Sequence, residues 1–245
     1  MRGTLLFPLL LAGLLGSAGC YIDDFGGFGR FPKDFHYSYP LKAGGRLSVE
    51  GFNGSVEVSG WDQETVDISG TKYGPNADDV DSLKIEINNS PDSVSVRAVR
   101  PSDFRGRWGT RYSIRAPRRA VLDLINTSNG EIHLIDGSGP GRFHTSNGAI
   151  RLETFQGSVD AQTSNAPVEL TDVTGEAVVR TSNGRIHADH LKGSLQANTS
   201  NGIISVDLAA AGDRPLRLET SNGPVDVTLP AKFWSLYDST VIRAG

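Results

Sequence analysis

Four side chains that can ligate a metal ion fall at related positions in the second half of the chain. Asp172 and His190 are 18 residues apart, as are Asp189 and Asp207. If residues 18 apart lie above one another, these four side chains converge on one corner of the fold. Oxygen-rich clusters of this type bind Ca²⁺ or other divalent cations. The spacing therefore indicates either a cation-binding corner or a solvated group of polar residues beside a turn.

A second group of candidate binding residues is rich in arginine. The segment from residue 97 to residue 119 contains a single acidic residue, Asp103, and these arginines: Arg97, Arg100, Arg105, Arg107, Arg111, Arg115, Arg118 and Arg119. In a chain with a formal net charge of −4, an electropositive patch around Arg105, Arg107 and Arg111 would suit anionic lipid headgroups, lipopolysaccharide phosphates or acidic polysaccharide. The alternative is that strand alternation distributes the arginines over two faces and a loop, where acidic residues pair with them.

The element that must position these residues is a repeat. The tetrapeptide Thr-Ser-Asn-Gly occurs five times, and a sixth copy ends in Ala166 instead of glycine. Its asparagines are Asn129, Asn147, Asn165, Asn183, Asn201 and Asn222, which gives four steps of 18 residues and a last step of 21. Self-similarity at a fixed period of this length is typical of an array of stacked units.

Each repeat alternates apolar and polar residues after its asparagine. The third residue on is always isoleucine or valine, as in Ile132 and Ile150, and the fifth is also apolar, whereas the residue between them is polar. This period of two predicts a strand with one buried face. A second alternating stretch precedes the next asparagine, and a regular glycine between the two strands, such as Gly139 or Gly157, suits a tight bend.

Units of this size cannot bury their apolar faces alone, but stacking makes continuous parallel sheets around a narrow core. The predicted fold is therefore all-β, a single parallel β-solenoid with coils of ~18 residues, about two strands per coil and almost no helix. The left-handed hexapeptide-repeat helix of some acyltransferases is excluded, because Ile132 is followed at six-residue steps by Ser138 and His144. We expect one short helical turn near residues 76–83, with Asn76 as its cap.

The stacked asparagines are expected to form a ladder of amide hydrogen bonds along the axis, with the following glycine supplying positive φ in the turn. This is a structural role. The alternative is a repeated binding surface for a periodic polymer.

The N-terminus has the pattern of an export signal. Residues 1–19 contain one basic residue, Arg2, then an apolar run from Leu5 to Leu15 and four small residues before Cys20. This run is too short for a membrane-spanning helix and predicts a signal peptide. Small residues leading into a cysteine resemble a bacterial lipobox, although Ser17 stands where leucine is commonest. Cys20 is the only cysteine, so it has no intramolecular partner and is the predicted lipidation site; ordinary cleavage that leaves a free cysteine is the alternative.

The remaining segments are assigned by composition. Residues 20–40, rich in aromatics and glycine, are expected to form a lipidated tether whose aromatics cap the first coil or lie at the membrane interface; a self-associating arm is the alternative. Residues 41–245 form the predicted solenoid, with irregular N-terminal coils at 41–120, regular coils at 121–230 and a C-terminal cap at 231–245. Phe52-Asn53-Gly54-Ser55 is a degenerate copy of the repeated turn.

Several motifs together resemble a known family, the bacterial β-strand-repeat proteins labelled "putative adhesins", whose function is unknown. They are the segment from Gly51 to Asp62, the strand containing Tyr112, Ile114 and Pro117, the Thr-Ser-Asn-Gly coils and the final Gly223-x-Val225-x-Val227-x-Leu229-Pro230. The resemblance covers roughly residues 40–245. It implies a β-solenoid exposed at the cell envelope, sometimes linked with adhesion or with sensing of envelope stress, and it brings no catalytic residues.

These patterns favour a lipid-anchored, non-catalytic envelope protein that serves as an adhesin or a surface-display scaffold, without a cofactor. If the cell has two membranes, Tyr21 after the lipidated cysteine favours the outer one. One alternative is an envelope-stress sensor that binds anionic lipid or cell-wall polymer, and another is a carbohydrate-active enzyme on the side of the solenoid. The acidic balance does not suggest a nucleic-acid partner.

Overall fold

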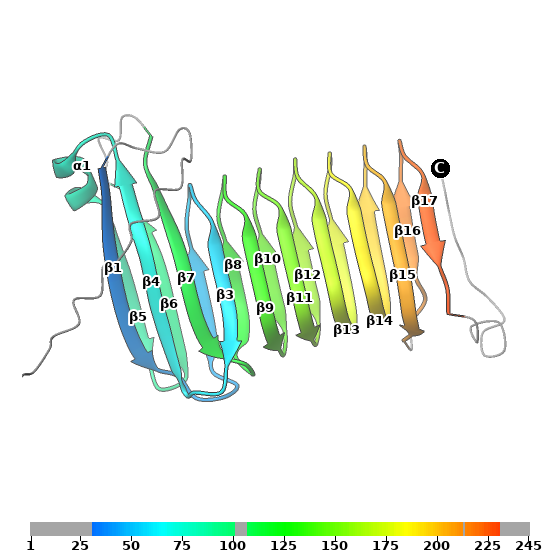
Figure 1. The fold of residues 1–245 in the computed structure, drawn as a ribbon, viewed down its shortest axis with the longest axis horizontal. Coiled ribbons are helices and arrows are strands. Elements are labelled where there is room, and N and C mark those ends of the chain that lie inside the picture. Colours follow the sequence, from blue (N-terminus) through cyan, green and yellow to red (C-terminus); the bar gives the residue numbers. More distant parts are fainter. Residues whose placement is uncertain (1–30, 101–106, 213, 231–245) are drawn as a thin grey trace, which may run out of the picture.

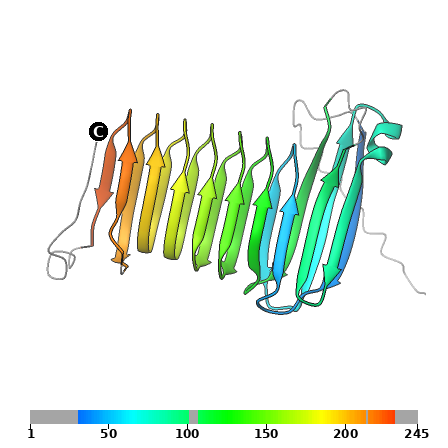
Figure 2. The same ribbon diagram turned by 180° about the vertical axis from the view of Figure 1, so that it is seen from behind.

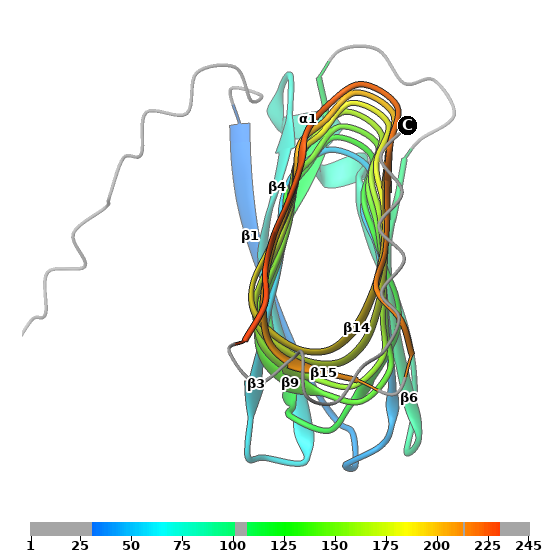
Figure 3. The same ribbon diagram turned by 90° about the vertical axis from the view of Figure 1, so that its right-hand side faces the viewer.

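The computed structural model describes residues 31–100, 107–212 and 214–230. They form an all-β solenoid whose regular coils stack in parallel with a period of 18 residues, as the repeat predicts. Seen along its axis, the solenoid is a flattened oval with two long faces and two narrow corners (Figure 3). In the described part of the chain, no helix is both long and apolar enough to span a bilayer.

We call the two faces A and B. Face A consists of these strands in spatial order: β1 (Phe31–Pro40), β4 (Thr65–Gly74), β7 (Gly109–Pro117), β3 (Val56–Trp61), β9 (Ile132–Ser138), β11 (Ile150–Gln156), the first parts of β13 (Val168–Arg180) and β14 (Ile186–Thr199), β15 (Ile204–Ala211) and β17 (Val225–Thr228). The strands follow one another along the axis from β1 at one end to β17 at the other (Figure 1).

Face B lies behind face A in Figure 1 and is seen from outside in Figure 2. Its strands in spatial order are β5 (Lys84–Ser90), β6 (Ser93–Val99), β2 (Arg46–Glu50), β8 (Val121–Asn126), β10 (Gly141–His144), β12 (Val159–Gln162), the second parts of β13 and β14, and β16 (Arg217–Thr220). Each regular coil therefore contains two strands, as predicted.

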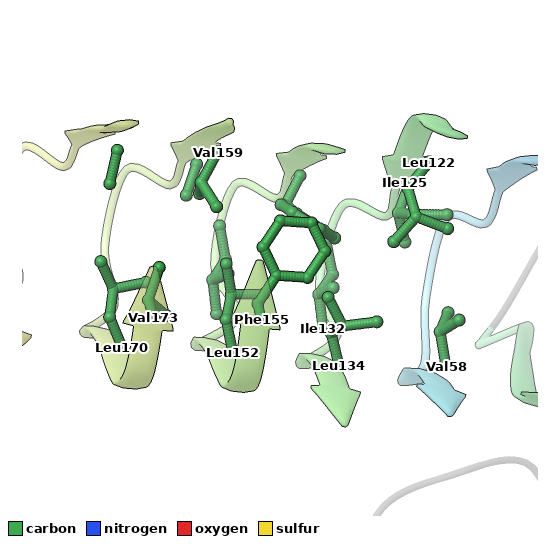
Figure 4. Close-up of a cluster of buried hydrophobic side chains, with 14 of the residues drawn as sticks. Val58, Leu122, Ile125, Ile132, Leu134, Leu152, Phe155, Val159, Leu170 and Val173 are labelled. Carbon is green, nitrogen blue, oxygen red and sulfur yellow. The ribbon is translucent and has the colours of Figure 1, made fainter. Parts of the chain in front are cut away.

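The main core is an apolar layer between the faces, and Phe52, Leu83 and Trp108 form a smaller separate cluster. Inward residues of equivalent position stack from coil to coil, as Ile132, Ile150 and Val168 do, and all three are fully buried. Phe155 and Phe143 fill the middle of the layer with their rings edge to face at 6.3 Å. Figure 4 shows these columns: Leu134, Leu152 and Leu170 succeed one another along the axis.

The N-terminal third differs from the regular coils. β4 runs antiparallel to both β1 and β7, and β5 runs antiparallel to β6. β7 lies between β3 and β4, and the early strand β2 lies between β6 and β8, so spatial order here departs from sequence order. The alternation of apolar and polar residues predicted the strands within residues 41–120, but it did not predict which strands pair with one another.

One boundary is corrected by the structure. We placed residues 20–40 in a tether, but Phe31–Pro40 form β1, which pairs with β4 along its whole length. Its inward side chain Phe35 packs edge to face on Tyr112 at 5.8 Å, which explains why this aromatic segment belongs to the fold. The predicted signal peptide, Cys20 and the cap at 231–245 lie outside the described residues.

The predicted helical turn is present as α1 (Ala77–Ser82). Asn76 caps it, because its side-chain oxygen accepts a hydrogen bond from the backbone N–H of Asp79 at 2.8 Å. α1 joins β4 on face A to β5 on face B.

Candidate functional site

The Thr-Ser-Asn-Gly turns lie at one corner of every regular coil, and the asparagines form a continuous ladder. Each Asn Nδ2 donates to Oδ1 of the asparagine one coil earlier, at 2.5–2.9 Å, through Asn129, Asn147, Asn165, Asn183, Asn201 and Asn222. The first acceptor is Asn53, whose own Nδ2 donates to the carbonyl of Trp108. The degenerate turn at Phe52–Ser55 is therefore a real member of the ladder.

The threonines of the same motif support the turn from inside. Their hydroxyls are buried and donate to the backbone carbonyl of the residue that closes the preceding turn, as Thr145 does to Gly130 and Thr181 does to Ala166. The threonine hydroxyls and the asparagine amide oxygens from Asn53 to Asn201 are thus hydrogen-bonded within the fold. This geometry favours the structural role over a repeated binding surface.

The reason for the glycine in the motif differs from our expectation. Gly54 has positive φ, but Gly130, Gly148, Gly184, Gly202 and Gly223 are not among the positive-φ residues. A Cβ on Gly148 would instead lie 1.7 Å from the carbonyl oxygen of Gly130 in the adjacent coil. The close approach of stacked turns requires the glycine. At the opposite corner, Gly157, Gly175 and Gly193 have both positive φ and a close backbone neighbour.

That opposite corner contains the predicted cation ligands. Asp136, Thr154, Asp172 and His190 occur once per coil and all adopt the left-handed conformation, with φ between 53° and 61°. The structure brings Asp189, His190 and Asp207 together, so that one potential ligand atom from each lies within 4.8 Å of the other two. Asp172 Oδ1 lies 4.0 Å from His190 Nδ1. All four predicted residues are therefore neighbours.

The arginine-rich segment is distributed over both faces. Arg97 is on β6 of face B and pairs with Glu50, whereas Arg111 and Arg115 are on β7 of face A. Arg115 pairs with Asp67 at 3.4 Å, and Arg118 pairs with Asp62 at 3.3 Å.

Of the three residues proposed as an anionic-ligand patch, Arg105 lies outside the described residues. The Arg111 guanidinium stands 5.8 Å from the centroid of the Tyr73 ring, and Arg107 is exposed just before β7. The sequence did not predict the perturbed carboxyl group of Asp67 on the neighbouring strand β4. Hydrogen bonding from His36, and then from Arg115, holds its pKa below the usual value.

The outward column of face A that contains His133, Arg151 and Glu169 is a chain of ion pairs. Arg151 contacts both Glu131 and Glu169, and Arg185 contacts Glu169. Hydrogen bonding from Arg185 is the main cause that lowers the pKa of Glu169. The column therefore resembles a solvated ladder of opposite charges, as its alternating signs predicted.

A hollow of about 520 Å³ opens at the β1 end of the solenoid and bears on the enzyme alternative. Among its lining residues are Asp34, Asp81 and Glu86 together with Phe35 and Tyr37. A glycosidase needs a carboxyl group with a raised pKa as general acid. Here the hydrogen bond from Lys33 lowers the pKa of Asp81, and Asp34 accepts a hydrogen bond from Thr71. The lowered pKa of Asp81 does not suit a general acid.

No protein-family model matches the sequence, and neither does any curated protein. Solved structures of similar architecture include a "putative adhesin" from Bacteroides fragilis NCTC 9343, with 13% identity, a TM-score of 0.49, and coverage of 82% of this chain and 100% of the other. A "putative cell adhesion protein" from Clostridium sporogenes ATCC 15579 has 11% identity and a TM-score of 0.41, covering 80% of this chain and 99% of its own.

A third structure, a "putative lipid binding protein" from Parabacteroides distasonis ATCC 8503, has 15% identity and a TM-score of 0.32, covering 82% of this chain and 95% of its own. At these identities and TM-scores, the three structures carry no inference about the family, role or ligand of this chain.

Proposed function

We propose that the chain is a non-catalytic adhesin or display module of the bacterial cell envelope, held to a membrane by lipid on Cys20. The observation that carries this proposal is the axial order of the strands. β1 lies at one end of the solenoid and β17 at the other (Figure 1). The ten strand levels of face A span about 40–45 Å at ~4.8 Å per strand.

The predicted anchor lies next to the β1 end in the sequence. Ten residues separate Cys20 from Phe31, the first residue of β1. At ~3.3–3.6 Å per residue, these can span at most about 35–40 Å. A lipid on Cys20 would therefore keep the β1 end near the bilayer and leave the regular coils free to project from it.

The surface of the regular coils suits display rather than chemistry. The amides of one corner hydrogen-bond to one another, and face A carries an ion-pair ladder. Such a scaffold presents outward columns of side chains at a fixed spacing to a partner.

The anchor is tested by expressing the wild-type chain and Cys20→Ser in a bacterium fed an alkyne-labelled fatty acid. We expect label and membrane association for the wild type alone. Equal labelling, or equal membrane recovery of both, would contradict the anchoring. Tyr21→Asp, which keeps the cysteine, is the matched control: it should keep the label and change at most the membrane in which the protein resides.

The adhesive role needs a separate measurement. The chain from residue 20 onward with Cys20→Ser, coupled to beads, should bind a subset of surface glycans or lipids on an array. Serine replacements at Arg107 and Arg111 then test whether the arginines contribute. Turnover of an arrayed glycan would favour the enzyme alternative, and absence of all binding would contradict adhesion to these ligands.

A further inference from the structure

We infer that Asp189, His190 and Asp207 form a binding site for a divalent transition-metal ion, with Zn²⁺ as the best-matched probe. The inference is independent of the proposed function, because it concerns the corner opposite the asparagine ladder. It rests on an irregularity in the stacking that occurs at this corner between β14 and β15.

The irregularity is a change of register. Ala188 pairs with Val206 and Leu191 pairs with Leu208, so two residues of β14, Asp189 and His190, lie opposite the single residue Asp207 of β15. Such a bulge redirects side chains, and bulges are frequent beside functional sites. Asp207 is thereby placed beside both residues of β14, whereas in the preceding coils each residue stacks on one equivalent.

The ligand atoms at this corner indicate the type of metal more narrowly than carboxylates alone would. It offers one imidazole nitrogen and two carboxylate oxygens, with Asp172 Oδ1 4.0 Å from the imidazole as a further donor. Imidazole suits zinc, copper and nickel, and carboxylates complete many zinc sites. The histidine therefore favours Zn²⁺ over the Ca²⁺ that carboxylates alone would suggest.

The charge of the corner is also uncompensated. At equivalent corner positions of earlier coils, Asp136 contacts Arg118 and Glu153 contacts His133. Among the described residues, no lysine or arginine forms an ion pair with Asp172, Asp189 or Asp207; only His190 approaches the first two. Three carboxylates thus surround one imidazole, an arrangement that a divalent cation would neutralise.

The side chains can close on an ion. Zinc ligands lie ~2.0–2.2 Å from the metal, so their atoms must approach one another to about 3.5 Å. His190 Nδ1 is already 3.3 Å from Asp189 Oδ2, and the two side chains are 59% and 39% exposed. No side-chain hydrogen bond to a described residue restrains either of these two side chains, so both can rotate toward an ion. Water would fill the remaining positions.

The test uses the chain from residue 20 onward with Cys20→Ser and without an affinity tag, so that neither a thiol nor a tag binds metal. Isothermal titration with Zn²⁺ should give one site per chain. His190→Asn is the informative variant, because asparagine tolerates the left-handed conformation found at φ 53°. It should weaken Zn²⁺ binding at least tenfold, and Asp207→Asn should do the same, with an unchanged circular dichroism spectrum.

The matched control is His133→Asn, which removes a half-buried histidine that also contacts a carboxylate, Glu153, on the same face. It should leave Zn²⁺ affinity unchanged. Co²⁺ in place of Zn²⁺ should give visible absorption bands that His190→Asn abolishes. The inference is overturned if the parent chain shows no saturable Zn²⁺ binding below 1 mM as the tested limit, or if His190→Asn binds as tightly as its parent.

Discussion

Asn129 Nδ2 donates a hydrogen bond to Asn53 Oδ1 at 2.5 Å, although 76 positions separate the two residues. The coil that contains Asn53 lies directly beneath the first regular coil, since β2 pairs with β8 and β3 pairs with β9. Strands β4, β5, β6 and β7 lie on the far side of it. The amide ladder therefore crosses the boundary between the irregular and the regular parts of the solenoid.

The ladder should contribute measurably to stability at each rung. Asn147 takes part in two amide hydrogen bonds of 2.7 Å, one with Asn129 and one with Asn165. Asn147→Ala should lower the free energy of unfolding by about 1–2 kcal/mol, because each exposed hydrogen bond contributes ~0.5–1 kcal/mol. Urea denaturation measures the loss. Gln162→Ala on the exposed side of β12 is the control, and an equal effect of both changes would contradict the role of the ladder.

Because the stacked turns approach each other closely, adding one methyl group to a turn should lower the stability of the protein. Gly148→Ala places a Cβ against the Gly130 carbonyl and should destabilise the protein by about 1–3 kcal/mol, the usual range for overpacking. The degenerate turn offers the reverse change: Ala166→Gly should cost less, about 0.5–1 kcal/mol, since it removes a methyl group that already fits and adds backbone freedom in the unfolded chain. Thermal unfolding of both variants tests this, and the opposite ranking would contradict it.

The buried threonines should matter for their hydroxyls rather than their volume. Thr181 Oγ1 donates to the Ala166 carbonyl at 3.1 Å, and Thr181→Val leaves that buried acceptor unpaired, at a cost of about 1–2 kcal/mol. Thr110 is equally buried, but its hydroxyl makes no well-formed hydrogen bond within the described residues, although the Tyr112 hydroxyl is close to it. Thr110→Val should therefore be neutral or stabilising in the same denaturation assay. Equal losses for both would show that shape, not hydrogen bonding, is responsible.

The ion-pair ladder on face A predicts a dependence on pH. Hydrogen bonds from Arg185 and Arg151 lower the pKa of Glu169 below its ordinary value of 4.5, and the side chain is only 21% exposed. A lowered pKa in the folded state stabilises the protein above the ordinary value, and this contribution is lost as the pH falls through the lowered one.

Glu169→Gln should therefore cost about 1 kcal/mol at pH 7, and its difference from the wild type should shrink as the pH falls below 4.5. Urea titrations at several pH values measure this. Glu57→Gln, on β3 of the same face, is the control with no ion pair to a described residue. A pH-independent difference for Glu169→Gln would contradict the electrostatic explanation.

The sequence predicted the regular coils closely because its repeats carry register information. Ile132 and Ile150 occupy equivalent positions in successive repeats, so they lie in one column when the repeats stack. The paired strands show this spacing of 18 residues. The Asn76 cap was predictable for a similar reason, since its side chain acts on a backbone N–H only three residues away. The neighbours of Asp189 and His190 followed from the same spacing.

By itself, then, the sequence determined which residues face the core, the period of the coils and the members of the amide ladder. Only the tertiary structure decided that β7 enters between β3 and β4, that Phe31–Pro40 belong to the sheet, and that Asp207 lies opposite two residues. Alternation fixes which face of a strand is buried, but not which strand lies beside it. Where no repeat imposes a register, long-range packing of side chains such as Phe35 on Tyr112 chooses the neighbour.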